Sequence, residues 1–183
     1  MESLQGHFLI ATPQMPDPRF HERIIYMCAH NDDGAMGLTV NQPVPNVTLA
    51  DIFRSANLAV PDRSLPHVYM GGPVEMDAGF FLFSSEYEPR NFIQVTPTVS
   101  LSRDPEILRE IWKGQGPKEF IFALGYAGWA AGQLENELIM NGWLTLPAED
   151  EVLFHTPDEL KWKKAARRFG IDIALFGDVI GTA

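Results

Sequence analysis

The fold is indicated most directly by residues 23–40, which read RIIYMCAHNDDGAMGLTV. The first part, Arg23–His30, is apolar and partly β-branched, as in a buried strand. Asn31-Asp32-Asp33-Gly34 is a turn signal, and Ala35–Val40 returns as a second apolar segment. A short turn between two such segments predicts a β-hairpin, in which the two strands are antiparallel.

Further strands and helices are expected on both sides of this hairpin. Apolar and β-branched runs predict strands at Gly6–Ala11, His67–Met70, Phe80–Phe83, Phe92–Val95, Glu119–Gly125, Trp143–Leu146 and Val152–Phe154. Capping residues and helical spacing predict helices after Thr48, from Asp104 to Gly114, over Ala130–Asn141 and from Thr156 to Phe169. Residues 171–183 have no clear pattern. Strands outnumber helices and tight turns join several of them, so we expect an α+β fold with mostly antiparallel, curved sheets rather than a doubly wound parallel sheet.

Length and composition indicate a single domain over residues 1–183. With 183 residues, 45% of them hydrophobic, the chain can bury a core without disulfides or a structural metal. Cys28 is the only cysteine, so no internal disulfide forms and an oxidising compartment has no support. Residues 1–14 lack the pattern of a signal peptide, and the uncharged stretch Phe120–Leu134 is too short to cross a bilayer. The sequence therefore predicts a cytosolic protein that does not bind membranes.

The chain is acidic, and the acidity is uneven. Fourteen Lys and Arg stand against 24 Asp and Glu, a net charge of −10, which disfavours direct binding of phosphate-rich nucleic acid. Between Lys118 and Lys161 lie eight acidic residues and no Lys or Arg, so we expect the partner, a protein or a small molecule, to be cationic or neutral. The basic run that begins at Lys161 is interpreted as the solvated face of a helix. The buried stripe of that helix is expected to be Trp162, Ala165, Ala166 and Phe169.

Sequence motifs for metal, cofactor or nucleophilic chemistry are missing. None of the five histidines pairs with another at helical ligand spacing, so neither a metal nor a cofactor is expected. Cys28 and His30 lie two apart on a predicted strand and would share a face, but a lone cysteine in an apolar run is usually part of the core. The amides of Gly71-Gly72-Pro73 could cradle an anion, although a tight turn is the simpler interpretation.

One segment, Gly125–Trp143, differs from an ordinary connection between a strand and a helix. A buried strand ends at two aromatic residues flanked by glycines, Tyr126 and Trp129, and a helix then begins. Loops at strand ends are common places for binding sites. On the helix, Gln133 and Glu137 share one side at i, i+4. A binding surface and plain aromatic packing beside a solvated helix both explain this segment.

Several short stretches match one family of bacterial proteins. In chain order they are Gly6–Pro13 with Met15 and Asp17–Phe20, Gly34–Leu38 with Asn41 and Pro43, Gly71–Val74, Gly125–Trp129, Gln133–Glu135 with Glu137, and Trp143-Leu144. On these residues the chain resembles the AlgH/YqgE family. The resemblance implies several coiled β-sheets with flanking helices, described as containing an SH3-like barrel, and no established reaction. Family members have been linked to transcriptional regulation of exopolysaccharide production. No helix-turn-helix is evident in this sequence, so such a role would be indirect.

The leading hypothesis is a non-catalytic binding or regulatory protein. The residues proposed for ligand contact are Met15, Asp17, Phe20, Asn41, Gly71, Gly72, Pro73, Tyr126, Trp129, Gln133 and Glu137. The three stretches that hold most of them, Met15–Phe20, Gly71–Pro73 and Tyr126–Glu137, are expected to meet in one pocket. The alternative is a small hydrolase or transferase with Glu135 or Glu137 as the base, which requires these carboxylates to converge with others in a cleft. Glu135 is also expected to be partly buried and to need a partner.

Overall fold

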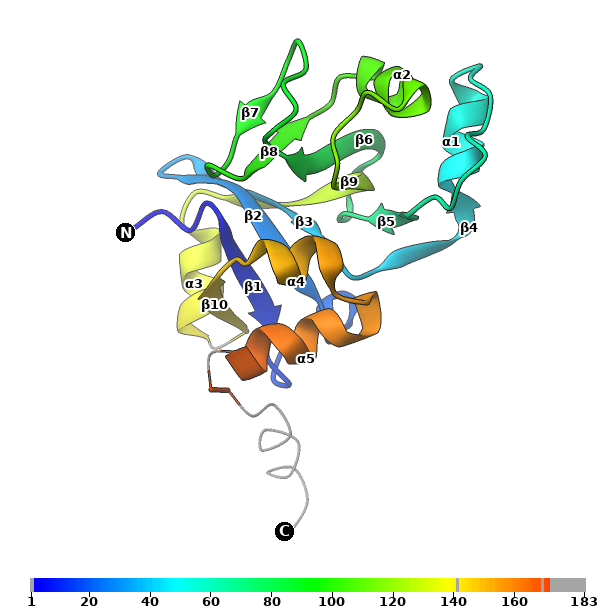
Figure 1. The fold of residues 1–183 in the computed structure, drawn as a ribbon. Helices are drawn as coiled ribbons and strands as arrows, with labels where there is room; N and C mark the ends of the chain where they lie inside the picture. Colours follow the sequence, from blue (N-terminus) through cyan, green and yellow to red (C-terminus); the bar gives the residue numbers. More distant parts are fainter. Residues whose placement is uncertain (1, 141, 169, 172–183) are drawn as a thin grey trace.

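The computed structural model describes residues 2–140, 142–168 and 170–171 (Figure 1). The strands are β1 (His7–Ala11), β2 (Ile24–Asn31), β3 (Gly34–Thr39), β4 (Pro43–Thr48), β5 (His67–Met70), β6 (Val74–Ser84), β7 (Ile93–Gln94), β8 (Val99–Ser102), β9 (Phe120–Ala130) and β10 (Trp143–Pro147). The helices are the 3-10 turn η1 (Pro18–Phe20) and α1 (Leu49–Ser55), α2 (Glu106–Lys113), α3 (Gln133–Ile139), α4 (Asp150–His155) and α5 (Asp158–Arg168). None of these helices is long and apolar enough to span a bilayer.

Most strands form one curled sheet. Its order is β10-β1-β2-β3-β9-β6-β8-β7, and each neighbouring pair on this path is antiparallel. β5 lies parallel to β9 and also pairs with β4. The sheet curls as a half-barrel, so that Gln5, before β1, donates from Nε2 to the carbonyl of Val95, after β7, at 2.9 Å. The predicted α+β fold with mostly antiparallel, curved sheets is confirmed (Figure 1).

The hairpin predicted at residues 23–40 is present as β2 and β3. Tyr26 pairs with Leu38, and Asn31 pairs with Gly34 at the turn. Gly34 has φ +141, a backbone conformation that side chains disfavour. The turn and the two apolar segments therefore form the hairpin that the sequence predicted.

A bulge in β2 separates two residues that were expected to share a face. The register with β3 shifts between Met27 and Ala29. Cys28 lies in the core cluster that contains Tyr26, whereas His30 contacts α3 on the opposite side of the sheet. The prediction that Cys28 and His30 point the same way is wrong, because a bulge adds one residue and inverts the alternation beyond it.

β9 is the central strand, and it continues through the segment that was expected to be a loop. Before Gly125 it pairs with β5 and β6, and after it Ala127–Ala130 pair with β3. Gly125 has φ +71, which lets the strand kink without ending. A Cβ on Gly71 would overlap the carbonyl oxygen of Gly125, and one on Gly72 would overlap the backbone of Tyr126. The loop prediction is wrong because strand pairing continues past the glycine.

The predicted helices are present, but the bounds of α3 differ from the prediction and α4 was not predicted. Thr48 is the N-cap of α1 and Gly114 ends α2, as predicted. Asp51 adds a reciprocal hydrogen bond that completes a capping box with Thr48. Val152–Phe154 was predicted as a strand and lies in α4, because a three-residue apolar run does not distinguish strand from helix. α3 is shorter than the predicted helix. The predicted last residues of the third and fourth helices, Asn141 and Phe169, lie outside the described residues, as do residues 172–183. β4 and β8 were not predicted, β4 because its two prolines disfavour a strand.

In the part of the chain that the structure describes, three clusters of buried side chains make up the core. One lies between the concave side of the sheet and α4 with α5, a second lies under α3 on the opposite side, and a third lies under α1 and α2. Trp162, Ala165 and Ala166 pack into the first cluster, which confirms them as the buried stripe of α5.

Lys161 was predicted on the solvated face of α5 and is 3% exposed instead. Its Nζ donates to the carbonyl of Val40 at 2.7 Å and pairs with Asp158 at 3.0 Å. The hydroxyl of Tyr69 donates to the same carboxylate at 2.9 Å. Burial raises the pKa of Asp158, but the Lys161 ammonium and the hydrogen bonds outweigh burial and hold that pKa below its usual value. A lysine can be buried in this way when its ammonium group finds fixed partners.

Candidate functional site

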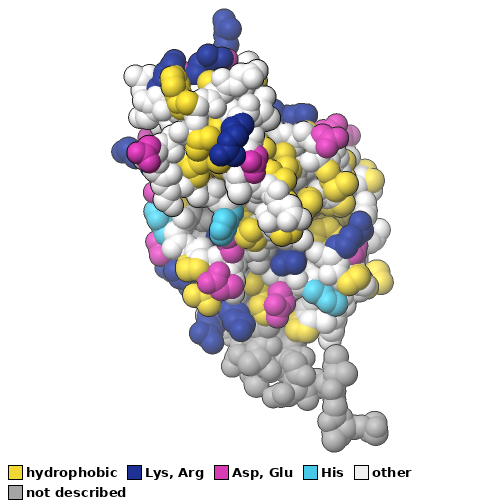
Figure 2. All heavy atoms as spheres, turned by 90° about the vertical axis from the view of Figure 1, so that its right-hand side faces the viewer, with side chains coloured by type: hydrophobic (Ala, Val, Ile, Leu, Met, Phe, Trp, Pro, Cys, Tyr) yellow, Lys and Arg dark blue, Asp and Glu magenta, His cyan; other side chains and the backbone are white. Residues whose placement is uncertain are grey.

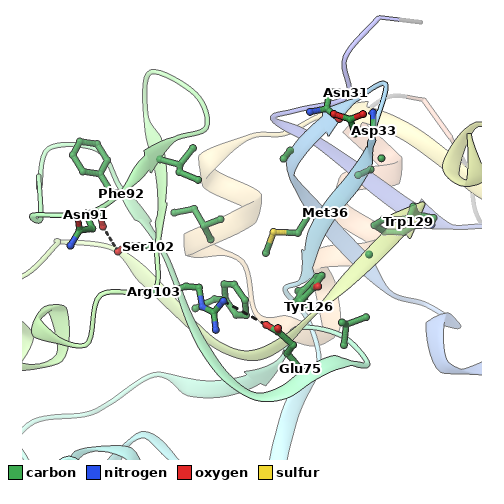
Figure 3. A pocket seen from close by; sticks show the side chains of 18 of the residues that line it. Asn31, Asp33, Met36, Glu75, Asn91, Phe92, Ser102, Arg103, Tyr126 and Trp129 are labelled. Carbon is green, nitrogen blue, oxygen red and sulfur yellow. Dashed lines mark hydrogen bonds and ion pairs between the residues drawn. The ribbon is translucent and has the colours of Figure 1, made fainter. Parts of the chain in front are cut away.

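A groove of about 1140 Å³ opens on the concave side of the curled sheet. Figure 3 shows it between the β2–β3 hairpin with β9 on one side and β6, β7 and β8 on the other. Phe80 and Leu101 belong both to its lining and to the core cluster under α4 and α5. The groove is therefore a continuation of that core which the helices leave uncovered.

The floor of the groove is apolar. It includes Met36 from β3, Phe80 from β6, Leu101 from β8 and Tyr126 from β9. The rings of Phe80 and Tyr126 meet edge to face, with centroids 5.7 Å apart, a favourable aromatic geometry. Met36 and Tyr126 are only partly buried, so the floor keeps apolar surface that a ligand would cover.

Charged side chains at the rim of the groove balance one another. Arg90 and Arg103 supply two positive charges, and Asp33 and Glu75 supply two negative ones. Arg103 lies with its guanidinium carbon 4.9 Å from the ring centroid of Phe80, and its Nη1 is 3.6 Å from Oε2 of Glu75. Both members of this ion pair are more than half exposed, so water screens it and it separates at little cost.

Apolar side chains also stand exposed at the rim. Phe92, directly before β7, and Ile93, its first residue, line the groove, and Ile93 is 62% exposed. These residues were predicted as part of a strand, but the groove itself was not predicted. No sequence signal indicated it, because the position of this strand at the edge of the sheet follows from pairing between distant segments.

Only two of the residues proposed for ligand contact line the groove, Tyr126 and Trp129. Tyr126 lies on the floor. Trp129 is at the border, and its indole packs on the opposite side of β9, where its ring centroid is 6.4 Å from that of Trp143. Residues 127 and 129 of a strand point away from residues 126 and 128. This alternation explains why Tyr126 lies on the groove floor while the indole of Trp129 packs on the opposite side.

Glu137 and Gln133 belong to a structural contact on that opposite side. Oε2 of Glu137 accepts hydrogen bonds from Nε1 of Trp129 and Nε1 of Trp143, both at 2.9 Å. Oε1 accepts from Nε2 of Gln133 at 3.0 Å. The carboxylate therefore ties α3 to β9 and β10. A role of these residues in ligand contact stays a prediction.

The loop from Met15 to Phe20 approaches the same side. Met15 is buried beside Trp143 in the cluster under α3, and the ring of Phe20 lies 5.4 Å from that of Trp143. Asp17 pairs with Arg19 at 2.6 Å. The structure thus brings the Met15–Phe20 stretch together with Trp129 and Glu137, but across the sheet from the groove.

Most of the remaining residues proposed for ligand contact make contacts within the fold. Gly71 and Gly72 pack against the backbone of β9, and Pro73 follows them as an exposed residue. Asn41 accepts from the amide of Ile24 at 3.1 Å and donates to the carbonyl of Glu22 at 2.9 Å. The three stretches that were expected to meet in one pocket therefore do not line a common one among the described residues.

The two glutamates of the alternative enzyme hypothesis have separate partners. Glu135 is partly buried, and its Oε1 lies 3.0 Å from Nε2 of His30. The hydrogen bond from His30 lowers the pKa of Glu135. Glu137 is held by the two indoles. Neither carboxylate lines a described groove or cleft, so the convergence that carboxylate catalysis requires is not found in the described part of the chain.

Residues for metal or thiol chemistry are not gathered either. Within the described residues, no three His, Cys, Asp or Glu side chains are placed to hold a metal ion. Cys28 is buried, and desolvation raises the pKa of its thiol to about 12. A thiol of that pKa carries almost no thiolate near neutral pH, so it is a poor nucleophile.

The face that carries α1, on the right of Figure 1, is shown in Figure 2. Lys and Arg side chains are interspersed there with Asp and Glu side chains and with apolar ones. Nucleic acid is bound by clustered Lys and Arg side chains, and the described part of this face shows no continuous basic surface.

The fold and the groove define a class, an α+β protein built on a curled antiparallel sheet with an open apolar groove. The sequence profile of the family described as AlgH-like matches residues 8–174. The chain is 44% identical over 181 residues to the UPF0301 protein DP2218 of Desulfotalea psychrophila, covering 99% of this chain and 95% of that protein. A UPF0301 protein of Serratia proteamaculans is 40% identical over 186 residues, covering 99% of this chain and 100% of that protein.

Solved structures of two other proteins have the same fold as this chain. The solution structure of the AlgH protein from Pseudomonas aeruginosa has a TM-score of 0.78 at 38% identity, covering 99% of this chain and 96% of that one. Protein DIP2367 of Corynebacterium diphtheriae, at 20% identity and a TM-score of 0.75 over 96% of this chain and 92% of that one, shares the fold. The chain belongs to the AlgH-like family, and the resemblance noted in the sequence is confirmed.

Proposed function

We propose that this protein is a non-catalytic binding protein and that the groove is its binding site. The observation that supports this is an apolar floor, made by Met36, Phe80, Leu101 and Tyr126, beneath a rim whose charges cancel. A ligand that covers the floor removes apolar surface from water, which favours binding. The volume of about 1140 Å³ exceeds the roughly 300–1000 Å³ of small-molecule pockets, so the proposal favours a protein segment.

The partner is proposed to be neutral where it contacts the groove. The two positive and two negative rim residues give no excess charge to attract a phosphate-rich ligand. A role in transcription, as the family resemblance suggests, would then be indirect and exerted through a captured protein. We place this binding in the cytosol, since Cys28 is the only cysteine of the chain.

The test is a titration with N-phenyl-1-naphthylamine, a neutral apolar dye whose fluorescence rises when it leaves water. We expect the wild-type protein to bind the dye and the Ile93→Asp variant to bind it about tenfold more weakly, because the new carboxylate must be desolvated at the rim. The matched control is Ile139→Asp, at an isoleucine of α3 that is 76% exposed. Equal dye binding by the two variants would remove the groove as the site.

A further inference from the structure

β7 lies at one end of the strand order and, among the described residues, pairs on one side only, with β8. The amide of Val95 donates to the carbonyl of Val99 at 2.9 Å, and Gln94 stands opposite Ser100. In an antiparallel ladder this makes Gln94 and Ser100 a non-hydrogen-bonded pair, so the N–H and C=O of Gln94 point away from β8. Neither group has a hydrogen-bond partner among the described residues.

The edge strand β7 is only two residues long, which limits pairing, but neither of its residues is charged or a proline. Natural sheets guard their edges with charges, prolines or a covering element. β7 itself consists of Ile93 and Gln94 and is preceded by the exposed Phe92. Phe92 and Ile93 line the groove, so free backbone groups and the apolar floor lie next to each other.

We propose that the groove takes an extended polypeptide segment of a partner protein, which adds to β7 as a strand. This inference rests on the proposed function and specifies its ligand. The backbone of the segment pairs with Gln94, and alternate side chains lie on the floor formed by Phe80 and Tyr126. Because the rim charges of the groove sum to zero, the residues of the segment that enter it are uncharged and apolar at every second position.

A second copy of this chain is a poorer occupant than a partner segment. β7 is two residues long, so pairing between two copies of it would form few backbone hydrogen bonds. Such pairing would also leave the floor at Met36 and Tyr126 open to water. A strand of about five or six residues, the usual length, would extend past β7 and cover that floor.

The experiment selects binders from a displayed library of random heptapeptides and measures their affinity as synthetic peptides. We expect selected sequences with apolar residues at alternate positions and few charges. Gln94→Pro removes the N–H that faces away from β8 and should weaken peptide binding about tenfold. The matched variant Gln94→Ala keeps that N–H and should bind within about twofold of wild type. Dye binding should stay unchanged in both variants.

The outcomes separate this inference from the proposed function. Equal peptide binding by Gln94→Pro and Gln94→Ala overturns strand addition, as does a library that yields no binder while the dye still binds. Peptides N-methylated at alternate amides, tested on wild-type protein, give a second measurement that does not depend on the folding of a variant, and undiminished binding of them also overturns it. Self-association in sedimentation velocity that Gln94→Pro abolishes would assign the edge to a second copy. The proposed function fails separately, if the dye does not distinguish Ile93→Asp from Ile139→Asp.

Discussion

Glu137 on α3 accepts hydrogen bonds from two buried indoles through a single oxygen, Oε2, with both nitrogens at 2.9 Å. The substitution Glu137→Ala would leave the N–H groups of Trp129 and Trp143 without their acceptor. An unsatisfied buried donor costs about 1–3 kcal/mol, so the free energy of unfolding should fall by about 2–6 kcal/mol for the two together. The lower end applies if water reaches either indole through the space that the side chain leaves.

The assay is equilibrium urea unfolding, followed by tryptophan fluorescence and extrapolated to water. Two matched variants separate hydrogen bonding from charge and from helix surface effects. Glu137→Gln keeps an acceptor oxygen and should cost about 1 kcal/mol, the difference between a charged and a neutral acceptor. Gln133→Ala removes two exposed hydrogen bonds, one to Oε1 of Glu137 and one that the Gln133 side chain accepts from the amide of Ala130, and should cost about 1 kcal/mol or less. If Glu137→Ala costs no more than Glu137→Gln, the indoles do not depend on this carboxylate and the reasoning is refuted.

Three further perturbations test other parts of the structure. Gly72→Ala should lower the free energy of unfolding by about 3 kcal/mol, because its Cβ would overlap the backbone of β9, whereas Gly132→Ala, with nothing within 4 Å of its Cβ, should cost only about 1–2 kcal/mol for its positive φ. Urea unfolding measures both, and equal losses would contradict the close packing. Cys28, with its pKa raised to about 12 by burial, should react with iodoacetamide at pH 8 far more slowly in folded than in urea-unfolded protein, and equal rates would contradict its burial. The pKa of Asp158 lies below its unfolded value of 3.8, so its ionised form contributes stability that is present above that pH and lost as the pH falls through the folded pKa. Asp158→Asn should therefore lose less stability than wild type between pH 5 and pH 3, and an equal loss would contradict the contribution of Asp158.

Local patterns in the sequence predicted those elements whose structure depends on neighbouring residues. The hairpin of β2 and β3 follows from a turn signal between two apolar segments, and the N-cap at Thr48 follows from its place directly before a helical pattern. The kinked strand β9 was missed, because a glycine after an apolar run ordinarily ends a strand. Here the pairing of Ala127–Ala130 with β3, a contact between distant segments, carries the strand past Gly125.

The residues predicted for ligand contact lie on two sides of the sheet, because contacts between distant segments also decide their places. Tyr126 and Trp129 are close in sequence, but alternation along β9 places one on the floor of the groove and directs the other toward α3. Phe80 and Met36, which complete the floor, come from strands that sequence alone does not bring together. Lys161 was misplaced because the carbonyl of Val40, its acceptor, lies far away in the sequence.

The groove as binding site is tested most directly by backbone NMR of the ¹⁵N-labelled protein titrated with N-phenyl-1-naphthylamine. If the groove is the site, the largest amide shift changes will fall on Met36, Phe80, Ile93 and Tyr126. Changes centred on α3 and the Met15–Phe20 loop, with the groove amides unmoved, would contradict it.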